Sequence, residues 1–478
     1  MGKRVNPPTG DIGCTDEVSS SAMSCGVAQA EIYFRPQSTY DGEFGFDWMR
    51  IGDWDWNRTL HATDNFVANK YSDNSMLAGG KGITGTATIS AAQAAYAKLE
   101  DEYTKLPING QTENYHFHWL SIFPKVLADS FNAEASSKSL HASARLEFSA
   151  TLDILIKIKD IADKPDRIIF INGYPDNLTV TTSTGEATNF NKGTALPTIS
   201  CTSITTNAKQ ILGTITVTCQ KELKYDAPIS AYAVKGDSAT LAGVLMVCKN
   251  HSTKVCKKQD VLVALIKTDR TGASPQDGAN VFNTIPSHEK LIYQLLHHQL
   301  LYGEVEVNGT LIDLSNDIKF RLKTSLAGSD ATHADAEKYC NATGVIPINL
   351  SSITTFNDFL IELAKPFDYL NGLLPNKYRK YAKLFTFQET WATNPGVSGV
   401  AMGFSSKMAM NFREIASFHT TPAHELNHSL GLRHTFGDSD APYIYTTNGQ
   451  TDNIMSYSDR IPAHTWYWQW KIVNEKLR

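Results

Sequence analysis

The stretch TTPAHELNHSLGLRHTFGD, residues 420–438, decides how the C-terminal part of the chain folds. It contains the pattern H-E-x-x-H-x-x-G-x-x-H, in which His424 and His428 lie four residues apart. Thr421 followed by Pro422 predicts a helix start, because a threonine hydroxyl caps a helix and proline suits its first position. Residues four apart on a helix point from the same face. We therefore expect both imidazoles to reach a single ion.

The rest of the pattern predicts a catalytic rather than a structural metal site. Gly431 can adopt the left-handed conformation that ends a helix, so that the chain turns and brings His434 back toward the ion. Three ligands, His424, His428 and His434, leave the fourth tetrahedral position of Zn²⁺ open to water. Glu425 lies beside the ion and can accept the proton of that water. The alternative interpretation is a helix whose histidines bind no metal.

A second motif, TDNIMSYSDR, follows at residues 451–460 and supplies the methionine turn of metzincins. With HTF after the glycine and NIMSY in this motif, the chain resembles the metzincins, and most of all their pappalysin-type (cytophagalysin) branch. The resemblance implies that Met455 lies beneath the zinc site and that Tyr457 helps to stabilise the tetrahedral intermediate. Asn427 departs from the branch, which commonly has glycine at this position.

The resemblance implies a zinc metalloendopeptidase, in which one Zn²⁺ polarises the scissile carbonyl and Glu425 activates the attacking water. Two other functions stay open: an inactive, protease-like structural or docking part of a secretion apparatus, and a zinc amidase that acts on cell-wall peptides. Some relatives also bind Ca²⁺ near the active site. Asp438, Asp440 and Asp452 are the candidate ligands, although solvated loop carboxylates explain them more simply.

The chain of 478 residues is long enough for about three domains. Apolar residues alternate over residues 144–158, which predicts a half-buried strand with residues 166–171 as its partner. Further strands are expected at 214–219, 242–248 and 261–266. Two linkers rich in turn residues are expected at 181–199 and 268–287. We predict an α+β multidomain protein with a β-rich module over 1–185, a second sandwich-like module over 195–270, and a metzincin-like α/β zinc protease domain over 280–478.

Within the expected protease domain, Thr355 and Asp358 resemble a capping box at the start of an amphipathic helix, which we expect to end at Pro366. Two strands are expected at 381–387 and 407–412. The second, KMAMNF, is the predicted rim strand that pairs with an extended peptide or protein substrate. Apolar residues at helical spacing, which predict a C-terminal helix, are Trp466, Trp470, Val473 and Leu477.

Seven cysteines make an odd count, so at least one is unpaired. Hairpins could bridge Cys201 to Cys219 and Cys248 to Cys256, and sequence leaves disulfides and free thiols equally open. His251, between Cys248 and Cys256, suggests a metal-like cluster, but a hairpin tip is the simpler interpretation. Cys25, in SCGVAQ, is a candidate latency thiol that could occupy the open zinc position, as an upstream Cys-Gly does in some metzincins.

The net charge of −5 gives no electrostatic case for a nucleic-acid partner. No run of 18 apolar residues predicts a membrane span, and the N-terminus lacks the apolar region of a Sec signal peptide. Segments such as GEFGFDWMRIGD and FHWLSIFP resemble leader regions of Bacteroidetes proteins linked to type VI or related contractile secretion. That resemblance implies an effector or toxin that is exported without a Sec signal and docks on the secretion machinery through its N-terminal modules.

Overall fold

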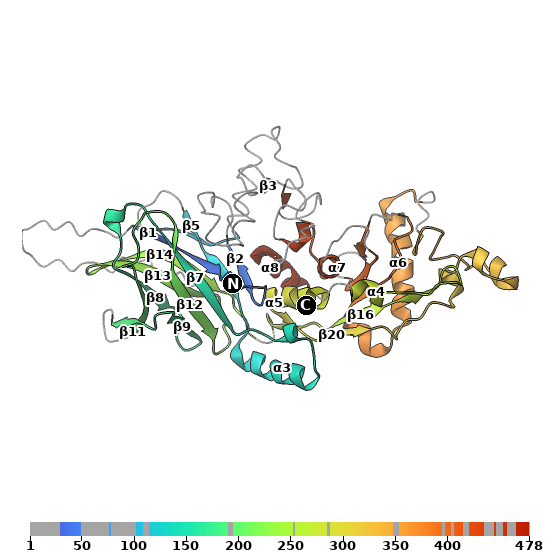
Figure 1. Cartoon of the computed structure of the whole chain (residues 1–478), viewed down its shortest axis with the longest axis horizontal. Helices are drawn as coiled ribbons and strands as arrows, with labels where there is room; N and C mark the ends of the chain where they lie inside the picture. The colour runs from blue at the N-terminus through green and yellow to red at the C-terminus, as the bar shows by residue number, and fades with distance from the viewer. Residues whose placement is uncertain are drawn as a thin grey trace, which may run out of the picture.

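The protein is described by a computed structural model of the whole chain. The described residues are 29–48, 76–77, 102–108, 114–189, 195–251, 254–283, 287–347, 353–393, 397–402, 406–413, 420–434, 444–445, 453–456 and 465–477. Mixed helices and sheets confirm the α+β class, and Figure 1 shows a β-rich half at one end and a mixed half at the other.

Two sheets share a core in the β-rich half, which we call the sandwich. The first sheet is antiparallel, with the order β1 (Ala30–Pro36), β7 (Ser149–Ile158), β12 (Gln210–Cys219) and β9 (Leu178–Thr182). The second has the order β10 (Ala187–Asn189), β11 (Ala195–Ser200), β8 (Arg167–Asn172), β13 (Ala227–Lys235), β14 (Ser238–Val247), β6 (His118–Ser121) and β2 (Gly45–Asp47). Ile154 of the first sheet and Val244 of the second belong to one buried cluster, so the two sheets stabilise each other.

The division into two β modules differs from the expectation. Strands from both expected modules, 1–185 and 195–270, pair within each of the two sheets. The segment expected to be a linker, 181–199, contains β10 and most of β11, and β8 pairs with β11 and β13 rather than with β7. The core is built by strands that are far apart in the sequence. Local sequence patterns do not reveal such pairing.

A third sheet forms the mixed half, with the order β20 (Val305–Asn308), β16 (Val261–Leu265), β21 (Ala382–Thr386), β23 (Met408–Asn411) and β22 (Gly399–Ala401). The first four strands are parallel, and β22 is an antiparallel edge strand. β16 therefore belongs here and not to the expected second module. The predicted rim strand KMAMNF was also placed wrongly, because β23 lies between β21 and β22.

Helices cover both faces of the third sheet, and successive side chains of each strand point to opposite faces. On one face, Phe385 and Met410 pack with α6 (Phe356–Gly372). On the other, Leu384 and Ala409 share a buried cluster with Leu426 of α7 (Thr421–Ser429). A parallel sheet is buried on both faces in this way.

Helix α6 begins with the predicted capping box of Thr355 and Asp358 but does not end at Pro366, which lies inside it. An interior proline costs about 3 kcal/mol. The two residues Phe367 and Leu370 beyond it are fully buried, and each contributes roughly 1.5–3 kcal/mol. Burial therefore offsets the proline, and the helix continues.

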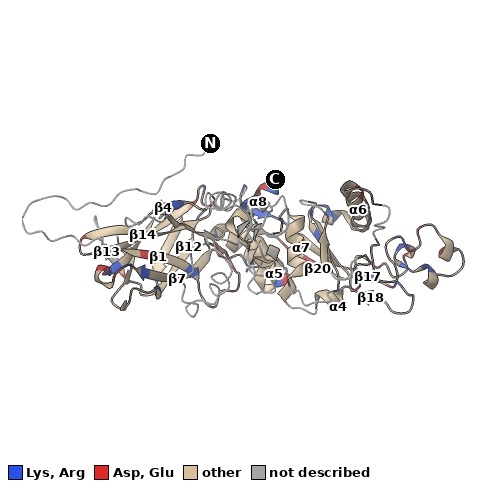
Figure 2. Ribbon diagram, turned by 90° about the horizontal axis from the view of Figure 1, so that it is seen from above, with Lys and Arg blue, Asp and Glu red and all other residues tan. Residues whose placement is uncertain are grey.

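The two halves meet through helices that lie between them in both views (Figures 1 and 2). These are α5 (Ser287–His298) and the C-terminal α8 (Tyr467–Lys476), which packs against the sandwich because Tyr467 stacks on Trp119 at 3.8 Å between ring centroids. The other elements are α3 (Lys125–Ser137), α4 (Ala279–Phe282) and the paired short strands Met76–Leu77 with Ile444–Tyr445, Lys105–Pro107 with Asn114–His116, Lys257–Lys258 with Leu301–Tyr302, and Lys267–Thr268 with Gln276–Asp277. Within the described ranges, none of the helices has the length and apolar character needed to cross a membrane.

The five cysteines in the described part of the chain are buried free thiols: Cys201, Cys219, Cys248, Cys256 and Cys340. The two hairpin disulfides considered from the sequence therefore do not form in the structure. Burial raises the pKa of Cys201 to about 12 and that of Cys219 to about 11, which keeps both thiols neutral at ordinary pH. Cys14 and Cys25 lie outside the described residues.

Candidate metal centre

Helix α7 carries the pattern that the sequence singled out, and its ends explain how the pattern folds. The N-cap residue is Thr420, not Thr421 as predicted, and its side chain makes no capping hydrogen bond within the described residues. The helix starts because Pro422 fits its first turn. It ends as predicted, because Gly431 adopts a φ of 114°, a conformation that disfavours any side chain.

The turn at Gly431 brings His424, His428 and His434 together as a group that could hold one metal ion. The Nε2 atom of His434 lies 3.3 Å from Nε2 of His424 and 3.0 Å from Nε2 of His428. Two nitrogens bound to a tetrahedral Zn²⁺ at 2.0–2.1 Å would be about 3.4 Å apart. The ring nitrogens thus lie close to the spacing that such an ion requires.

Backbone carbonyls fix which nitrogen of each helical histidine faces the centre. Nδ1 of His424 donates to the carbonyl of Ile454 at 2.7 Å, and Nδ1 of His428 donates to that of Leu432 at 2.8 Å. A carbonyl oxygen only accepts, so both Nδ1 atoms carry the proton and both Nε2 atoms present lone pairs. His434 can donate to only one of them, whereas a cation would satisfy all three.

The surroundings of His428 favour its neutral form, which is the form that binds metal. Burial, together with neighbouring His424 and His434, holds the pKa of His428 well below its usual range. His424 and His428 are only 3% and 6% exposed, so competing water is largely excluded.

A short turn beneath the centre, Ile454–Ser456, supplies the carbonyl that orients His424. Its Met455 is fully buried in the cluster that also contains residues of α7. Asn453 caps the turn by accepting from the Met455 amide at 2.9 Å, and its own amide donates to Gln469 of α8 at 2.8 Å. The turn that carries Met455 therefore packs against α7 and is held in place by the C-terminal helix.

The side chain of Glu425 lies against β22, the edge strand of the third sheet. Its side chain is 7% exposed, and burial raises its pKa to about 8. A cation beside it would favour the carboxylate and lower that pKa. A Cβ added at Gly399 of β22 would lie 2.3 Å from Cγ of Glu425, so the backbone of the edge strand touches this side chain.

Gly399 is a residue that the sequence interpretation missed. A glycine inside a strand often marks the close approach of another group, and GVSGVAMGF offered that signal without indicating which group approaches.

Asn427, the departure from the resembled branch, has a defined structural partner. Its Oδ1 accepts from Nε2 of Gln299 at 2.7 Å, and its own amide donates to the Ala423 carbonyl at 2.8 Å. Both side chains are buried. An asparagine here links α7 to the residue that follows α5, which a glycine would not do.

Several predicted or candidate site residues lie outside the described residues: Tyr457, Cys25, Asp438, Asp440 and Asp452. Among the residues that are described, the three histidines are the sole group that could hold a metal ion, and Cys248, His251 and Cys256 do not form such a group. His297 and His298 are buried in α5, where burial lowers the pKa of His297 to about 3.

No family model, curated protein or solved structure matches this chain. The site's chemistry is therefore the basis for a function.

Proposed function

We propose that the protein is a zinc-dependent peptidase that hydrolyses peptide bonds at the cluster of His424, His428 and His434. One observation carries the proposal: three imidazole lone pairs converge within a buried site while a carboxylate, Glu425, lies on the same helix next to the first ligand. Three nitrogen ligands are typical of catalytic zinc, which keeps one position for water or substrate.

Zinc held there would polarise the scissile carbonyl and make a water molecule more acidic. Glu425 accepts the proton of the attacking water and returns it to the leaving amine nitrogen. Its position against Gly399 limits the rotamers of Glu425, so the carboxylate is oriented before substrate binds. By the metzincin resemblance, Tyr457 donates a hydrogen bond to the oxyanion.

The edge strand β22 supplies a place for an extended substrate. β22 is the last strand of its sheet as the structure describes it, and its residues are half-buried. A peptide that adds to this edge would run beside Gly399 and hence beside Glu425. The corrected edge, β22 in place of KMAMNF, touches the proposed base through Gly399.

The test is Glu425→Gln in the full chain, with casein as substrate and zinc content measured by mass spectrometry. We expect unchanged zinc, because the three ligands remain, and a loss of hydrolysis of roughly a thousandfold, because the amide cannot accept the proton. Glu475→Gln, on α8, is the matched control and should keep full activity. Unchanged hydrolysis by Glu425→Gln would remove this carboxylate from the mechanism, and cleavage of peptidoglycan in place of casein would favour the amidase.

A further inference from the structure

A cavity of about 290 Å³ lies outside the carboxyl ends of the parallel strands of the third sheet, and we call it the strand-end crevice. Its wall includes Arg270 and Thr271 after β16, residues 388–390 after β21, and Arg413 after β23. The three histidines of the candidate metal centre and Glu425 do not line it, so it is separate from the proposed active site.

The order of the strands explains why a crevice opens at this point. Along the chain β16 is followed by β20 and then by β21, but in the sheet β20 and β21 lie on opposite sides of β16. Val263 of β16 shares a buried cluster with Leu291 of α5, which precedes β20, and Leu262 shares another with Phe367 of α6, which precedes β21. The two connections therefore run toward opposite edges and on opposite faces of the sheet. Open α/β sheets bind ligands in the crevice that forms at such a switch point.

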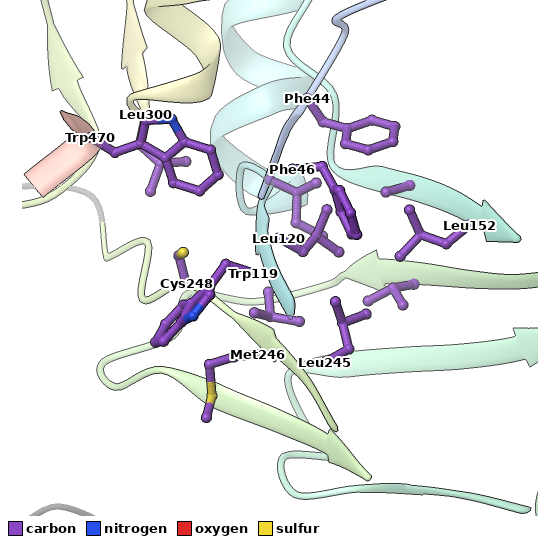
Figure 3. Close-up of a cluster of buried hydrophobic side chains, with 14 of the residues drawn as sticks. Phe44, Phe46, Trp119, Leu120, Leu152, Leu245, Met246, Cys248, Leu300 and Trp470 are labelled. Carbon is purple, nitrogen blue, oxygen red and sulfur yellow. The ribbon is translucent and has the colours of Figure 1, made fainter. Parts of the chain in front are cut away.

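The wall of the crevice is polar throughout. Besides two arginines and one glutamate, it consists of hydroxyl and amide side chains: Thr271, Ser274, Gln276, Thr343, Gln388 and Thr390. By contrast, apolar side chains such as Trp119, Leu245 and Trp470 fill the region where the sandwich meets α8 (Figure 3). The crevice thus suits a small polar ligand.

Arg270 is fixed in the wall by a buried carboxylate. Its Nε donates to Oε1 of Glu389 and its Nη1 donates to the carbonyl of Asn341, both at 2.6 Å, while Thr268 donates to the other oxygen of Glu389. The side chain of Glu389 is only 3% exposed. Nη2 of Arg270 has no partner among the described residues and is not one of the buried atoms that lack a partner, so this donor remains accessible. A guanidinium held in this way loses little freedom when it binds a ligand.

Arg413 adds a second positive charge to the same wall. Its backbone amide donates to the carbonyl of Glu389 at 3.2 Å, which places it beside the partner of Arg270. Its side chain is exposed, and no ion pair or hydrogen bond holds the guanidinium in the described part of the chain. Because Glu389 neutralises only one of the two guanidinium groups, the wall carries a net positive charge. The planar donors of arginine match the oxygens of phosphate and carboxylate groups.

We propose that the strand-end crevice binds a small polar molecule that carries a phosphate or carboxylate group. The oxyanion accepts hydrogen bonds from Nη2 of Arg270 and from the guanidinium of Arg413, and the hydroxyl and amide groups surround the rest of the molecule. The volume lies near the lower end of the range of about 300–1,000 Å³ that is usual for small-molecule sites. This proposal does not depend on the proposed peptidase activity.

The experiment measures binding to the full chain by isothermal titration calorimetry, with and without a metal chelator. Ribose 5-phosphate and citrate carry the two kinds of oxyanion, and ribose is the uncharged control. We expect saturable binding of at least one of the two anions, unchanged by the chelator, and no binding of ribose. Failure of both anions to bind would overturn the proposal. Binding that is lost with the chelator would place the anion on a metal ion and would overturn it as well.

Substitutions then locate the anion. Arg413→Gln should weaken its binding roughly tenfold, because a charge-assisted hydrogen bond is lost. Arg270→Gln combined with Glu389→Gln removes the guanidinium without leaving a buried charge unpaired, and it should abolish binding. Urea denaturation checks that this double variant is folded, and Arg413→Gln alone decides if it is not.

The matched control is Arg379→Gln, an exposed arginine that precedes β21 at the opposite end of the strand and does not line the crevice. This control should bind the anion as the parent protein does. Equal binding by Arg413→Gln and the parent protein would mean that the anion lies elsewhere and would overturn the proposal. Full binding by the folded double variant would overturn it too.

Discussion

Two fully buried asparagines, Asn250 in the sandwich and Asn411 in the third sheet, have opposite surroundings. Oδ1 of Asn250 accepts from the Leu223 amide and its Nδ2 donates to the Ile122 carbonyl, both at 2.8 Å. Neither side-chain atom of Asn411 has a partner among the described residues. In the sandwich, Asn250 holds two loops together by its hydrogen bonds. In the third sheet, the unpartnered side chain of Asn411 lowers the free energy of unfolding. Such a cost is expected where function is selected over stability.

The largest expected effect is on zinc content and hydrolysis, and it comes from the substitution of a histidine on α7. His428→Ala removes one of the three proposed metal ligands, so zinc content after dialysis should fall well below one per chain. Casein hydrolysis should fall roughly a thousandfold to ten-thousandfold, equivalent to about 4–5.5 kcal/mol of transition-state stabilisation. The exposed His333→Ala is the control and should change neither measurement. Retention of a full zinc equivalent by His428→Ala would exclude His428 as a ligand.

The next largest effect is on the free energy of unfolding, and it comes from the substitution of Asn250 in the sandwich. Asn250→Leu keeps a branched side chain of similar shape but leaves the Leu223 amide and the Ile122 carbonyl unsatisfied. We expect the free energy of unfolding to fall by about 2–4 kcal/mol, measured by urea denaturation. Zinc content below the transition should stay at the parent value, because Asn250 and the histidines lie in different halves. A loss of zinc without unfolding would show that the two regions are coupled.

A smaller effect sharpens the link between the edge strand and the proposed base. Gly399→Ala introduces a methyl group 2.3 Å from Cγ of Glu425, so the carboxylate must shift. A shift of about 1 Å in a catalytic group can lower the rate a hundredfold, and we expect a loss of roughly tenfold to a hundredfold in kcat with zinc retained. Gly372→Ala, at the end of α6, is the control because no described atom lies within 4 Å of its added Cβ. Equal kcat for both variants would place Glu425 elsewhere in the active protein.

The sequence predicted the convergence of the three histidines because its main determinants are local. His424, His428 and the turn at Gly431 lie within one helix and its end, where spacing alone fixes which side chains meet. The capping box of α6 is local for the same reason. Its end was missed because the packing of Phe367 and Leu370, a tertiary effect, outweighs the proline.

Strand partners could not be predicted in this way. All five residues of β16 are buried, and such a continuous apolar run is typical of a parallel strand covered on both faces. The burial pattern of β16 thus agrees with its sequence, but its position directly after the strands of the sandwich favours the wrong sheet. β22 has only three residues, all half-buried, so it has no period that would reveal the edge of the sheet.

The smallest expected effect is at Asn411. There we expect a substitution to raise the free energy of unfolding, whereas the substitution at Asn250 lowers it. Asn411 pairs with Gly399 across the sheet, and it is two residues from Ala409, which faces α7. Asn411→Leu removes two unpartnered polar atoms, so the free energy of unfolding should rise by about 1 kcal/mol, the reverse of Asn250→Leu. Thr386→Val, which removes another buried and unpartnered hydroxyl, should act in the same direction.

Because Asn411 lies next to the strand residue that touches Glu425, we expect casein hydrolysis by Asn411→Leu to fall severalfold while stability rises. Urea denaturation of the metal-free protein measures the first effect independently of activity, and a loss of stability in both variants would show that these polar groups support the fold as Asn250 does.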